Sequence, residues 1–176
     1  MKKLLVIVVV LVFAVPCLAQ TTQPPKPGPE VQKLAYSVGT WKTEGEVKAG
    51  SLLPAGKYFV TGTCEWFAGA FHMVCRSVGT GPAGKRTELS ILAYDAEAKA
   101  YTYYGISSLG ESVSSKGSLT GNTWTWVWDD RVAGKPAKFR ETVEQLSPTS
   151  DTFKTEYSVA SGPWTVFLEG KSTKVK

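Results

Sequence analysis

The stretch Cys64-Glu-Trp-Phe-Ala-Gly-Ala-Phe-His-Met-Val-Cys75 consists of two apolar, β-rich runs that flank a glycine, and each run ends in a cysteine. Glycine at the first central position of a two-residue loop is typical of a type II′ β-hairpin. If the chain folds back at Gly69-Ala70, Cys64 lies opposite Cys75. The stretch therefore predicts an antiparallel hairpin whose two cysteines meet across the ladder.

A disulfide between these cysteines would close a short loop, which stabilises the fold by about 2–3 kcal/mol on chain-entropy grounds. In a strict two-residue hairpin the pair falls at a hydrogen-bonded site, where side chains are farther apart. A slightly longer loop or a bulge would remove this difficulty. We expect the Cys64–Cys75 disulfide, with two free thiols as the alternative.

Alternation along the hairpin assigns its two faces. The more apolar face should point inward, and it carries Tyr58, Val60, Cys64, Trp66, Phe71, Met73 and Cys75. The other face carries Glu65 and His72, so the chain's one histidine is expected to point outward.

The rest of the chain continues the strand pattern, with short polar turns and no helix between the runs. Strand-like runs occur at Thr40–Lys48, Lys57–Phe67, Ala70–Gly79, Thr87–Tyr94, Tyr101–Ser107, Glu111–Leu119, Thr123–Asp129, Ala137–Leu146, Thr152–Ala160 and Trp164–Val175. Before them, Glu30–Tyr36 has apolar residues spaced for at most two helical turns.

About ten regularly spaced strands predict an all-β fold, an antiparallel meander with a short N-terminal helix. Closing the meander into a barrel removes the two edges that an open sheet of this size would expose. Alternation puts Trp124, Trp126 and Trp128 on one face of their strand, and Trp41 on the inner face of the first strand. A two-sheet sandwich is the alternative.

The first 19 residues have the pattern of a cleavable export signal. Lys2 and Lys3 precede an unbroken apolar run over 4–15, and small residues precede a cleavage point after Ala19. This run is shorter than the roughly 20 residues that cross a bilayer. A lipid anchor on Cys17 is the alternative, although proline stands where a small residue is expected. We expect a secreted or periplasmic protein, in a compartment that permits disulfides.

Cleavage would leave a proline-rich leader over 20–29 and a single barrel domain over 30–176. Loss of the two signal lysines lowers the formal net charge from +5 to +3. Charges of both signs are interspersed, and no basic stretch is dense enough to indicate a nucleic-acid partner. We expect a monomer without stable membrane insertion after cleavage.

Val38-Gly-Thr-Trp41, which opens the first strand, resembles the Gly-x-Trp motif of the calycin superfamily of lipocalins, fatty-acid-binding proteins and nitrobindins. A resemblance over nearly the whole chain after the signal is to a secreted bacterial family, domain of unknown function 1579. It is carried by Gly39-Thr-Trp-Lys-Thr-Glu-Gly45, Cys64-Glu-Trp-Phe67, Tyr101-Thr-Tyr-Tyr-Gly105, Gly121-Asn-Thr-Trp-Thr-Trp126 and Gly162-Pro-Trp164.

The resemblance implies a calycin-type barrel and no established activity. In calycins a basic side chain near the end of the last strand commonly covers the first-strand tryptophan. The candidates here are Lys171 and Lys174, and we expect Lys171 to cover Trp41. Nitrobindins bind haem through a histidine on a late strand, but this chain has no histidine after His72. We therefore expect no cofactor.

No arrangement of residues indicates catalysis or a metal site. A Ser-His-Asp triad would need His72, and no Gly-x-Ser-x-Gly motif accompanies it. Asp129-Asp130 lacks the surrounding ligands of a calcium loop. The cysteines are not a Cys-x-x-Cys redox pair. We expect a protein that is not an enzyme.

The aromatic residues favour a binding protein, because the mouths of such barrels are frequent ligand sites. The predicted site for a small hydrophobic or aromatic ligand comprises Tyr58, Trp66, Met73, Tyr101, Tyr103, Trp124, Trp126, Trp128 and Arg140. Arg140, Arg76 or Glu65 could anchor a polar group at the mouth. The alternatives are a structural barrel filled by its own side chains and an outward tryptophan stripe that stacks on sugars.

Overall fold

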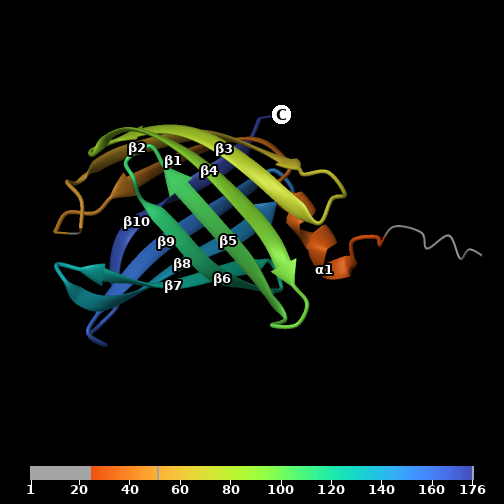
Figure 1. Cartoon of the computed structure of the whole chain (residues 1–176). Coiled ribbons are helices and arrows are strands. Elements are labelled where there is room, and N and C mark those ends of the chain that lie inside the picture. Colours follow the sequence, from red (N-terminus) through yellow and green to blue (C-terminus); the bar gives the residue numbers. More distant parts are fainter. Residues whose placement is uncertain (1–24, 51, 176) are drawn as a thin grey trace, which may run out of the picture.

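Ten antiparallel strands close into a barrel in the computed structural model, which describes residues 25–50 and 52–175 (Figure 1). The strands are β1 (Gly39–Val47), β2 (Gly56–Trp66), β3 (His72–Gly81), β4 (Gly84–Asp95), β5 (Ala100–Ser107), β6 (Ser112–Thr120), β7 (Thr123–Val132), β8 (Lys135–Ser147), β9 (Ser150–Val159) and β10 (Thr165–Lys174). The predicted all-β barrel is confirmed, and the sandwich is excluded. The predicted signal over 1–19 and residues 20–24 of the leader lie outside the described residues.

Each strand pairs with its neighbours in the sequence, and β1 closes the barrel by pairing with β10. Trp41 lies opposite Lys174 at one end of this last pairing, and Val47 lies opposite Leu168 at the other. Because every strand has a partner on both sides, the sheet has no edge that could pair with another chain.

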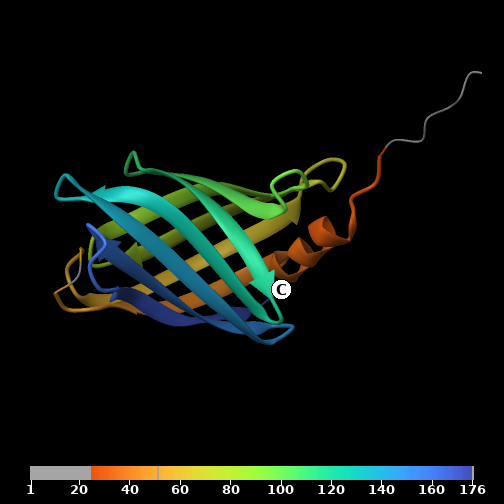
Figure 2. The ribbon, with the colours of Figure 1, turned by 90° about the horizontal axis from the view of Figure 1, so that it is seen from below.

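A short helical segment lies at one end of the barrel in both views (Figures 1 and 2). It consists of α1 (Pro29–Gln32) and the 3-10 turn η1 (Lys33–Ser37), and it leads directly into β1. This matches the two helical turns predicted from the sequence. We call this end of the barrel the helix end, and the opposite end, where β1 finishes and β2 begins, the far end.

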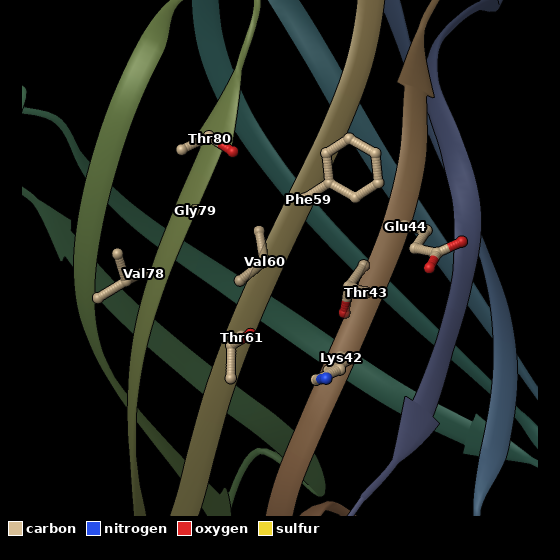
Figure 3. Close-up of a pocket in the computed structure, with 9 residues that line it drawn as sticks. All are labelled: Lys42, Thr43, Glu44, Phe59, Val60, Thr61, Val78, Gly79 and Thr80. Atoms are coloured by element: carbon tan, nitrogen blue, oxygen red, sulfur yellow. The ribbon is translucent and has the colours of Figure 1, made fainter.

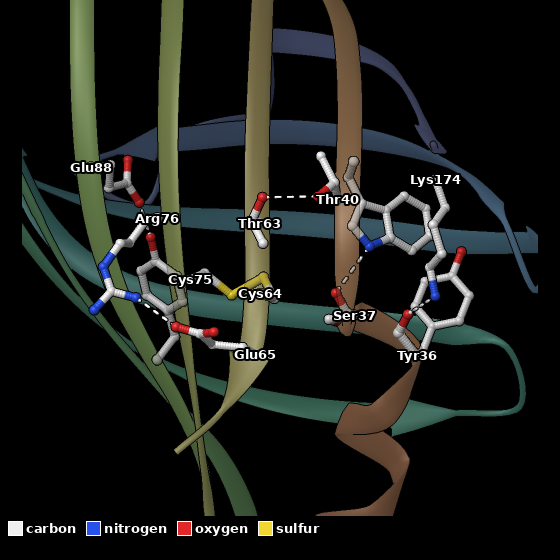
Figure 4. Close-up of a disulfide and its surroundings, with 12 residues drawn as sticks. Tyr36, Ser37, Thr40, Thr63, Cys64, Glu65, Cys75, Arg76, Glu88 and Lys174 are labelled. Carbon is white, nitrogen blue, oxygen red and sulfur yellow. Dashed lines mark hydrogen bonds and ion pairs between the residues drawn. A yellow bond between two sulfur atoms is a disulfide. The ribbon is translucent and has the colours of Figure 1, made fainter. Parts of the chain in front are cut away.

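The β2–β3 hairpin has the predicted register, with Cys64 opposite Cys75. Its loop differs from the prediction, because the strands separate after Trp66 and the loop is closed by hydrogen bonds from Phe67 N to His72 O and from Ala70 N to Phe67 O, both 2.8 Å. The longer loop moves the cysteines to a non-hydrogen-bonded pair, where strands approach more closely. Their Cα atoms are 4.1 Å apart and the disulfide is present (Figure 4).

The residues that face the interior on β2 and β3 are the ones predicted from the sequence. Exposed and less exposed residues alternate along the whole of β2, with Tyr58 and Trp66 on the inner face. In β3, Met73 is fully buried and His72 is exposed, as predicted. Across the described part of the chain, no helix is long and apolar enough to cross a membrane.

Candidate ligand site inside the barrel

The helix end of the barrel interior is closed by one leucine of the helical segment. Leu34 keeps only 1% of its surface exposed. It packs in one cluster with the buried side chains Met73, Leu92, Tyr101 and Trp124. The ring centres of Tyr101 and Trp124 are 4.6 Å apart in an edge-to-face arrangement, which aromatic pairs prefer. We call these five residues the closed-end cluster.

Hydrogen bonds hold the helical segment over this cluster. The Tyr101 hydroxyl donates to the Glu30 main-chain oxygen at 3.1 Å and to a Glu30 carboxylate oxygen at 2.9 Å. The Trp41 indole donates to Ser37 O at 2.9 Å. The Tyr36 hydroxyl donates to Ser150 O at 3.0 Å. These bonds join the segment to strands on different sides of the barrel, so it is fixed as a plug.

The basic side chain that covers Trp41 is Lys174, and the prediction of Lys171 is wrong. The Lys174 ammonium lies 4.9 Å from the centre of the Trp41 ring and donates to Tyr36 O at 3.0 Å. Lys171 is exposed on the outer face and lies opposite Glu44 in the β1–β10 ladder. Figure 4 shows Lys174 reaching toward Tyr36 beside the start of β1.

The interior beyond this cluster has a different character, because its inward side chains remain partly exposed. We call five of these residues the interior polar group: Tyr58, Glu88, Tyr103, Trp126 and Glu141. Each lies on the inward-facing phase of its strand, yet each is only partly buried. Surface that stays exposed on an inward side chain is surface that water can reach. The barrel interior is therefore accessible around this group.

Two glycines, one on the strand beside Trp126 and one on the same strand as Tyr103, let two rings of this group lie flat against the wall. A Cβ on Gly117 would be 2.5 Å from the Trp126 ring, and a Cβ on Gly105 would be 2.6 Å from the Tyr103 hydroxyl oxygen. Larger residues at these positions would push the rings toward the barrel axis. The small residues thus keep the aromatic rings at the wall.

Glu88 is the centre of a hydrogen-bonded network inside the barrel. It accepts a short hydrogen bond from the Tyr103 hydroxyl. It also pairs with the Arg86 guanidinium at 3.0 Å, and that guanidinium pairs with Glu111 at 2.9 Å. The charge of Arg86 is therefore already matched by two carboxylates.

Glu141 lies directly opposite Trp126 in the β7–β8 ladder and opposite Thr155 in the β8–β9 ladder. The Thr155 hydroxyl donates to its Oε2 atom at 3.0 Å. Burial raises the pKa of Glu141, the negative charge of Glu88 raises it further, and the Thr155 hydrogen bond acts in the opposite direction. Burial and the charge of Glu88 also raise the pKa of Tyr58 to about 12. The interior therefore disfavours the negative form of both groups.

The predicted site residues divide between these two regions. Trp66, Met73, Tyr101 and Trp124 lie in or against the closed-end cluster. Tyr58, Tyr103 and Trp126 belong to the interior polar group, and Tyr103 and Trp126 also pack against the closed-end cluster. Trp128 stacks on Phe139 with ring centres 5.2 Å apart. The tryptophan stripe of β7 faces inward, with Trp124 only 4% exposed. It is therefore not an outer platform for sugars.

Arg140 does not belong to the interior, which corrects the sequence prediction. Its neighbours Phe139 and Glu141 point inward, so Arg140 points outward. There it pairs with Glu156 at 2.8 Å and lies 4.4 Å from the centre of the Trp164 ring. Arg76 and Glu65 form an exposed ion pair of 3.0 Å on the outer wall (Figure 4), so they do not line the mouth either.

Sequence reasoning missed the polar residues of the interior: Arg86, Glu88 and Glu141. A signal for them was present. Glu88 has the same strand phase as Leu92, and Glu141 has the same phase as Phe139 and Val143. A charged residue that alternates in step with apolar residues has one of two explanations. Either the inner and outer faces of the strand have been exchanged, or the barrel interior contains a polar site.

The outer wall also has depressions. One of about 230 Å³ is lined mainly by outward side chains of β1, β2 and β3, including Lys42, Phe59 and Val78 (Figure 3), together with the inward residues Thr43 and Val60. Another, of about 490 Å³, lies over β8, β9 and β10 and includes Glu144 and Lys154. Within residues 25–50 and 52–175, no three His, Cys, Asp or Glu side chains are grouped to hold a metal ion.

Comparison with known proteins places the chain in a family and supports the fold. A family model described as "Protein of unknown function (DUF1579)" matches residues 26–174. No curated protein matches the chain significantly. The crystal structure of Rv2717c from M. tuberculosis is similar with a TM-score of 0.58 at 12% identity, covering 86% of this chain and 100% of that one. The S-type phycobiliprotein lyase CPES from Guillardia theta has a TM-score of 0.51 at 12% identity, covering 82% and 92%. At this identity the likeness concerns the fold alone.

Proposed function

The chain belongs to the DUF1579 family of unknown function, and we propose that it binds a small hydrophobic or aromatic molecule inside the barrel, beside the interior polar group. The ligand would enter from the far end, because the plug and the closed-end cluster occupy the helix end.

The observation that carries this proposal is the difference in exposure between inward side chains. Met73 and Tyr101 keep 0% and 3% of their surface exposed at the helix end. Tyr58, Tyr103 and Trp126 face the same interior and remain partly exposed. Binding sites for small molecules are typically lined by aromatic side chains with a few polar groups that orient the ligand. The interior polar group has this composition.

Polar atoms that are free to meet a ligand support the proposal. The Tyr58 hydroxyl makes no hydrogen bond to another residue in the described part of the chain, although it lies on the inner face. One oxygen of Glu141 also receives no hydrogen bond there. A ligand that engages either atom would replace water at a site that is otherwise aromatic.

Two adjacent residues of β2 provide a matched test. Tyr58 faces inward, while Phe59 faces outward, is 49% exposed and lines the outer depression of about 230 Å³. Titration of tryptophan fluorescence with 1-naphthylmethanol should give saturable quenching. We expect Tyr58→Ala to weaken binding about tenfold through loss of an aromatic contact and a hydrogen bond. Phe59→Ala should leave the affinity unchanged. The opposite pattern would place binding on the outer wall and contradict the proposal.

A second candidate function is supported by the outer wall of β4 and β5. Leu89 lies opposite Ile106 and Ile91 opposite Tyr104, and all four side chains are between 38% and 52% exposed. Exposed apolar patches often mark contact with another macromolecule. If fatty acids, haem and aromatic metabolites all leave the fluorescence unchanged, a barrel that acts through this wall becomes the better description.

We also propose that the protein is exported and that it carries no catalytic activity of its own. Export would place the Cys64–Cys75 disulfide in a compartment where it persists. Counting thiols on protein isolated from the periplasm tests this point. The proposal expects no reactive thiol from these two cysteines, and two reactive thiols per chain would contradict it.

A further inference from the structure

The interior of the barrel carries more acidic than basic groups. Arg86 is engaged by Glu88 at 3.0 Å and by Glu111 at 2.9 Å, so one cation already faces two carboxylates. Glu111 lies in the exposed turn before β6, whereas Glu141 is a second acidic side chain inside the barrel, within the electrostatic range of Glu88. Arg86 Nε is buried without a hydrogen-bond partner among the described residues, but the charge of Arg86 is already matched by Glu88 and Glu111, so a ligand carboxylate would add to the negative charge of this space.

Glu141 has room for one more hydrogen bond. Its Oε2 atom accepts from Thr155 at 3.0 Å, and its other oxygen accepts nothing from residues 25–50 and 52–175. Removing a carboxylate from water without satisfying its oxygens is costly. A hydrogen-bond donor on the ligand, especially a charged one, would meet this requirement.

The rings around Glu141 suit a cation as well as an apolar body. Trp126 is the direct cross-strand neighbour of Glu141. The ring centres of Trp126 and Tyr103 are 6.2 Å apart and inclined by 61°, so two aromatic faces of different orientation border the same space. One side of the Trp126 ring lies over Gly117 at the wall, and the ring is stacked in parallel with Trp124, with ring centres 5.8 Å apart. Aromatic faces attract ammonium groups, and tryptophan does so most strongly.

We propose that the ligand is an aromatic molecule with a protonated amine, and that Glu141 holds this ammonium beside the Trp126 ring. This inference rests on the proposed function, because it concerns the chemistry of the same interior site. Glu141 accepts a charged hydrogen bond from the amine, and the aromatic body of the ligand lies along Trp126 and Tyr103. The amine also offsets the excess of acidic groups around Arg86.

Three isosteric probes test the charge of the ligand: 1-naphthylmethylamine, neutral 1-naphthylmethanol and anionic 1-naphthoate. Titrated at neutral pH and low salt, the amine should bind the wild-type protein about tenfold more tightly than the alcohol, which is the scale of a desolvated cation–π contact with a charged hydrogen bond. The naphthoate should bind more weakly than the alcohol.

Two variants on the same strand test the assigned residue. Glu141→Gln keeps the shape and the acceptor for Thr155 but removes the charge. It should lower the affinity for the amine to that for the alcohol and leave the alcohol unchanged. Glu144→Gln is the control, because Glu144 is exposed on the outer face of β8, and it should change neither affinity.

The outcomes separate the two proposals. If the alcohol binds and the amine binds no better, the site exists but the assignment of an amine is overturned. If the amine is preferred equally by wild type and Glu141→Gln, the role of Glu141 is overturned. If none of the three probes binds, the proposed function itself fails, and the inference fails with it.

Discussion

The helix end and the remainder of the barrel interior are both lined by aromatic side chains, but they bury them to different degrees. At the helix end, Leu34 fills the space between Met73, Tyr101 and Trp124, and all four are less than 5% exposed. Around Glu141 no residue of the plug enters, and rings such as Trp126 remain partly exposed at the wall. The same strands thus build a packed core and, beside it, a region whose inward side chains are less buried.

This difference shows how a single short helical segment decides which end of a ten-strand barrel is packed. Closing the meander into a barrel removes the edges of the sheet, but it does not fill the interior. The helical segment fills one end and contributes the packing that stabilises the fold. The other end is left with small residues behind aromatic rings and with polar groups that are only partly satisfied. The proposal therefore assigns stability and binding to different layers of the interior.

The largest effect is expected from removing the side chain that closes the helix end. Leu34→Ala should lower the free energy of unfolding by about 2–5 kcal/mol, since it leaves a cavity in a fully packed cluster. Urea unfolding followed by tryptophan fluorescence measures this. Leu109→Ala is the control, because Leu109 is 51% exposed in the β5–β6 turn, and it should change stability by less than about 0.5 kcal/mol. Equal effects would mean that Leu34 does not close a packed core.

Loss of the disulfide should have the next largest effect on stability. Cys64 and Cys75 both pack against the closed-end cluster, and their separation in sequence is 11 residues. The double variant Cys64→Ala with Cys75→Ala should unfold with about 2–3 kcal/mol less free energy than the oxidised wild type. Wild type in strong reductant should approach the variant. A variant as stable as the oxidised protein would show that the bridge does not hold β2 to β3.

The two lysines of β10 offer a smaller and more specific comparison. Lys174→Gln loses the contact with the Trp41 ring and a charged hydrogen bond to Tyr36 O, which together should cost about 1–2 kcal/mol. Lys171→Gln removes an exposed charge from the outer face and should cost less than about 0.5 kcal/mol. Thermal unfolding of the two variants decides between these positions. A larger loss for Lys171→Gln would reverse the assignment made from the structure.

The smallest effect is a gain in stability, and it comes from the accessible region. Because burial raises the pKa of Glu141 above its ordinary value of 4.5, the folded state prefers the protonated form. The free energy of unfolding therefore falls as the pH rises from about 4.5 toward the raised pKa of Glu141, because the buried carboxyl must ionise. In acid the carboxyl is protonated in both states and this loss is absent. Glu141→Gln should be more stable than wild type at neutral pH, and the two should converge below about pH 4. Unfolding curves at both pH values test this. A difference that persists unchanged in acid would contradict it.

Much of the architecture could be predicted from the sequence, because it depends on local alternation. Gly69 and the two cysteines predict which residues of β2 and β3 lie opposite one another. The spacing of Trp124 and Trp126 predicts which face of β7 points into the barrel. The loop length was not predictable, because a four-residue loop and a two-residue loop give the same partners but opposite hydrogen-bonding phase. The structure shows the longer loop and thereby the closer cysteine pair.

The residues of the site were predicted less well, since their positions depend on how distant strands meet. Lys174 covers Trp41 because β10 pairs with β1 in the register that sets Trp41 opposite Lys174, and the register between strands so far apart in the sequence leaves no clear local signal. Arg140 was assigned to the interior because of its charge, although the phase of Phe139 excluded it. Glu88 and Glu141 were overlooked because a charged residue on an apolar face conflicts with the rule that identifies strands. Their positions mark the proposed site.

The most direct test of the accessible interior is to locate a bound probe by NMR. Two-dimensional ¹H–¹⁵N spectra of the labelled protein, titrated with 1-naphthylmethanol, should show saturable shifts in the Trp126 indole and in the main-chain amides of Tyr58, Tyr103 and Glu141. The signals of Leu34 and Met73 should change little, because the closed-end cluster has no space for a ligand. Shifts confined to outer-wall residues around Phe59 and Val78, or no saturable shift at all, would contradict a binding site inside the barrel.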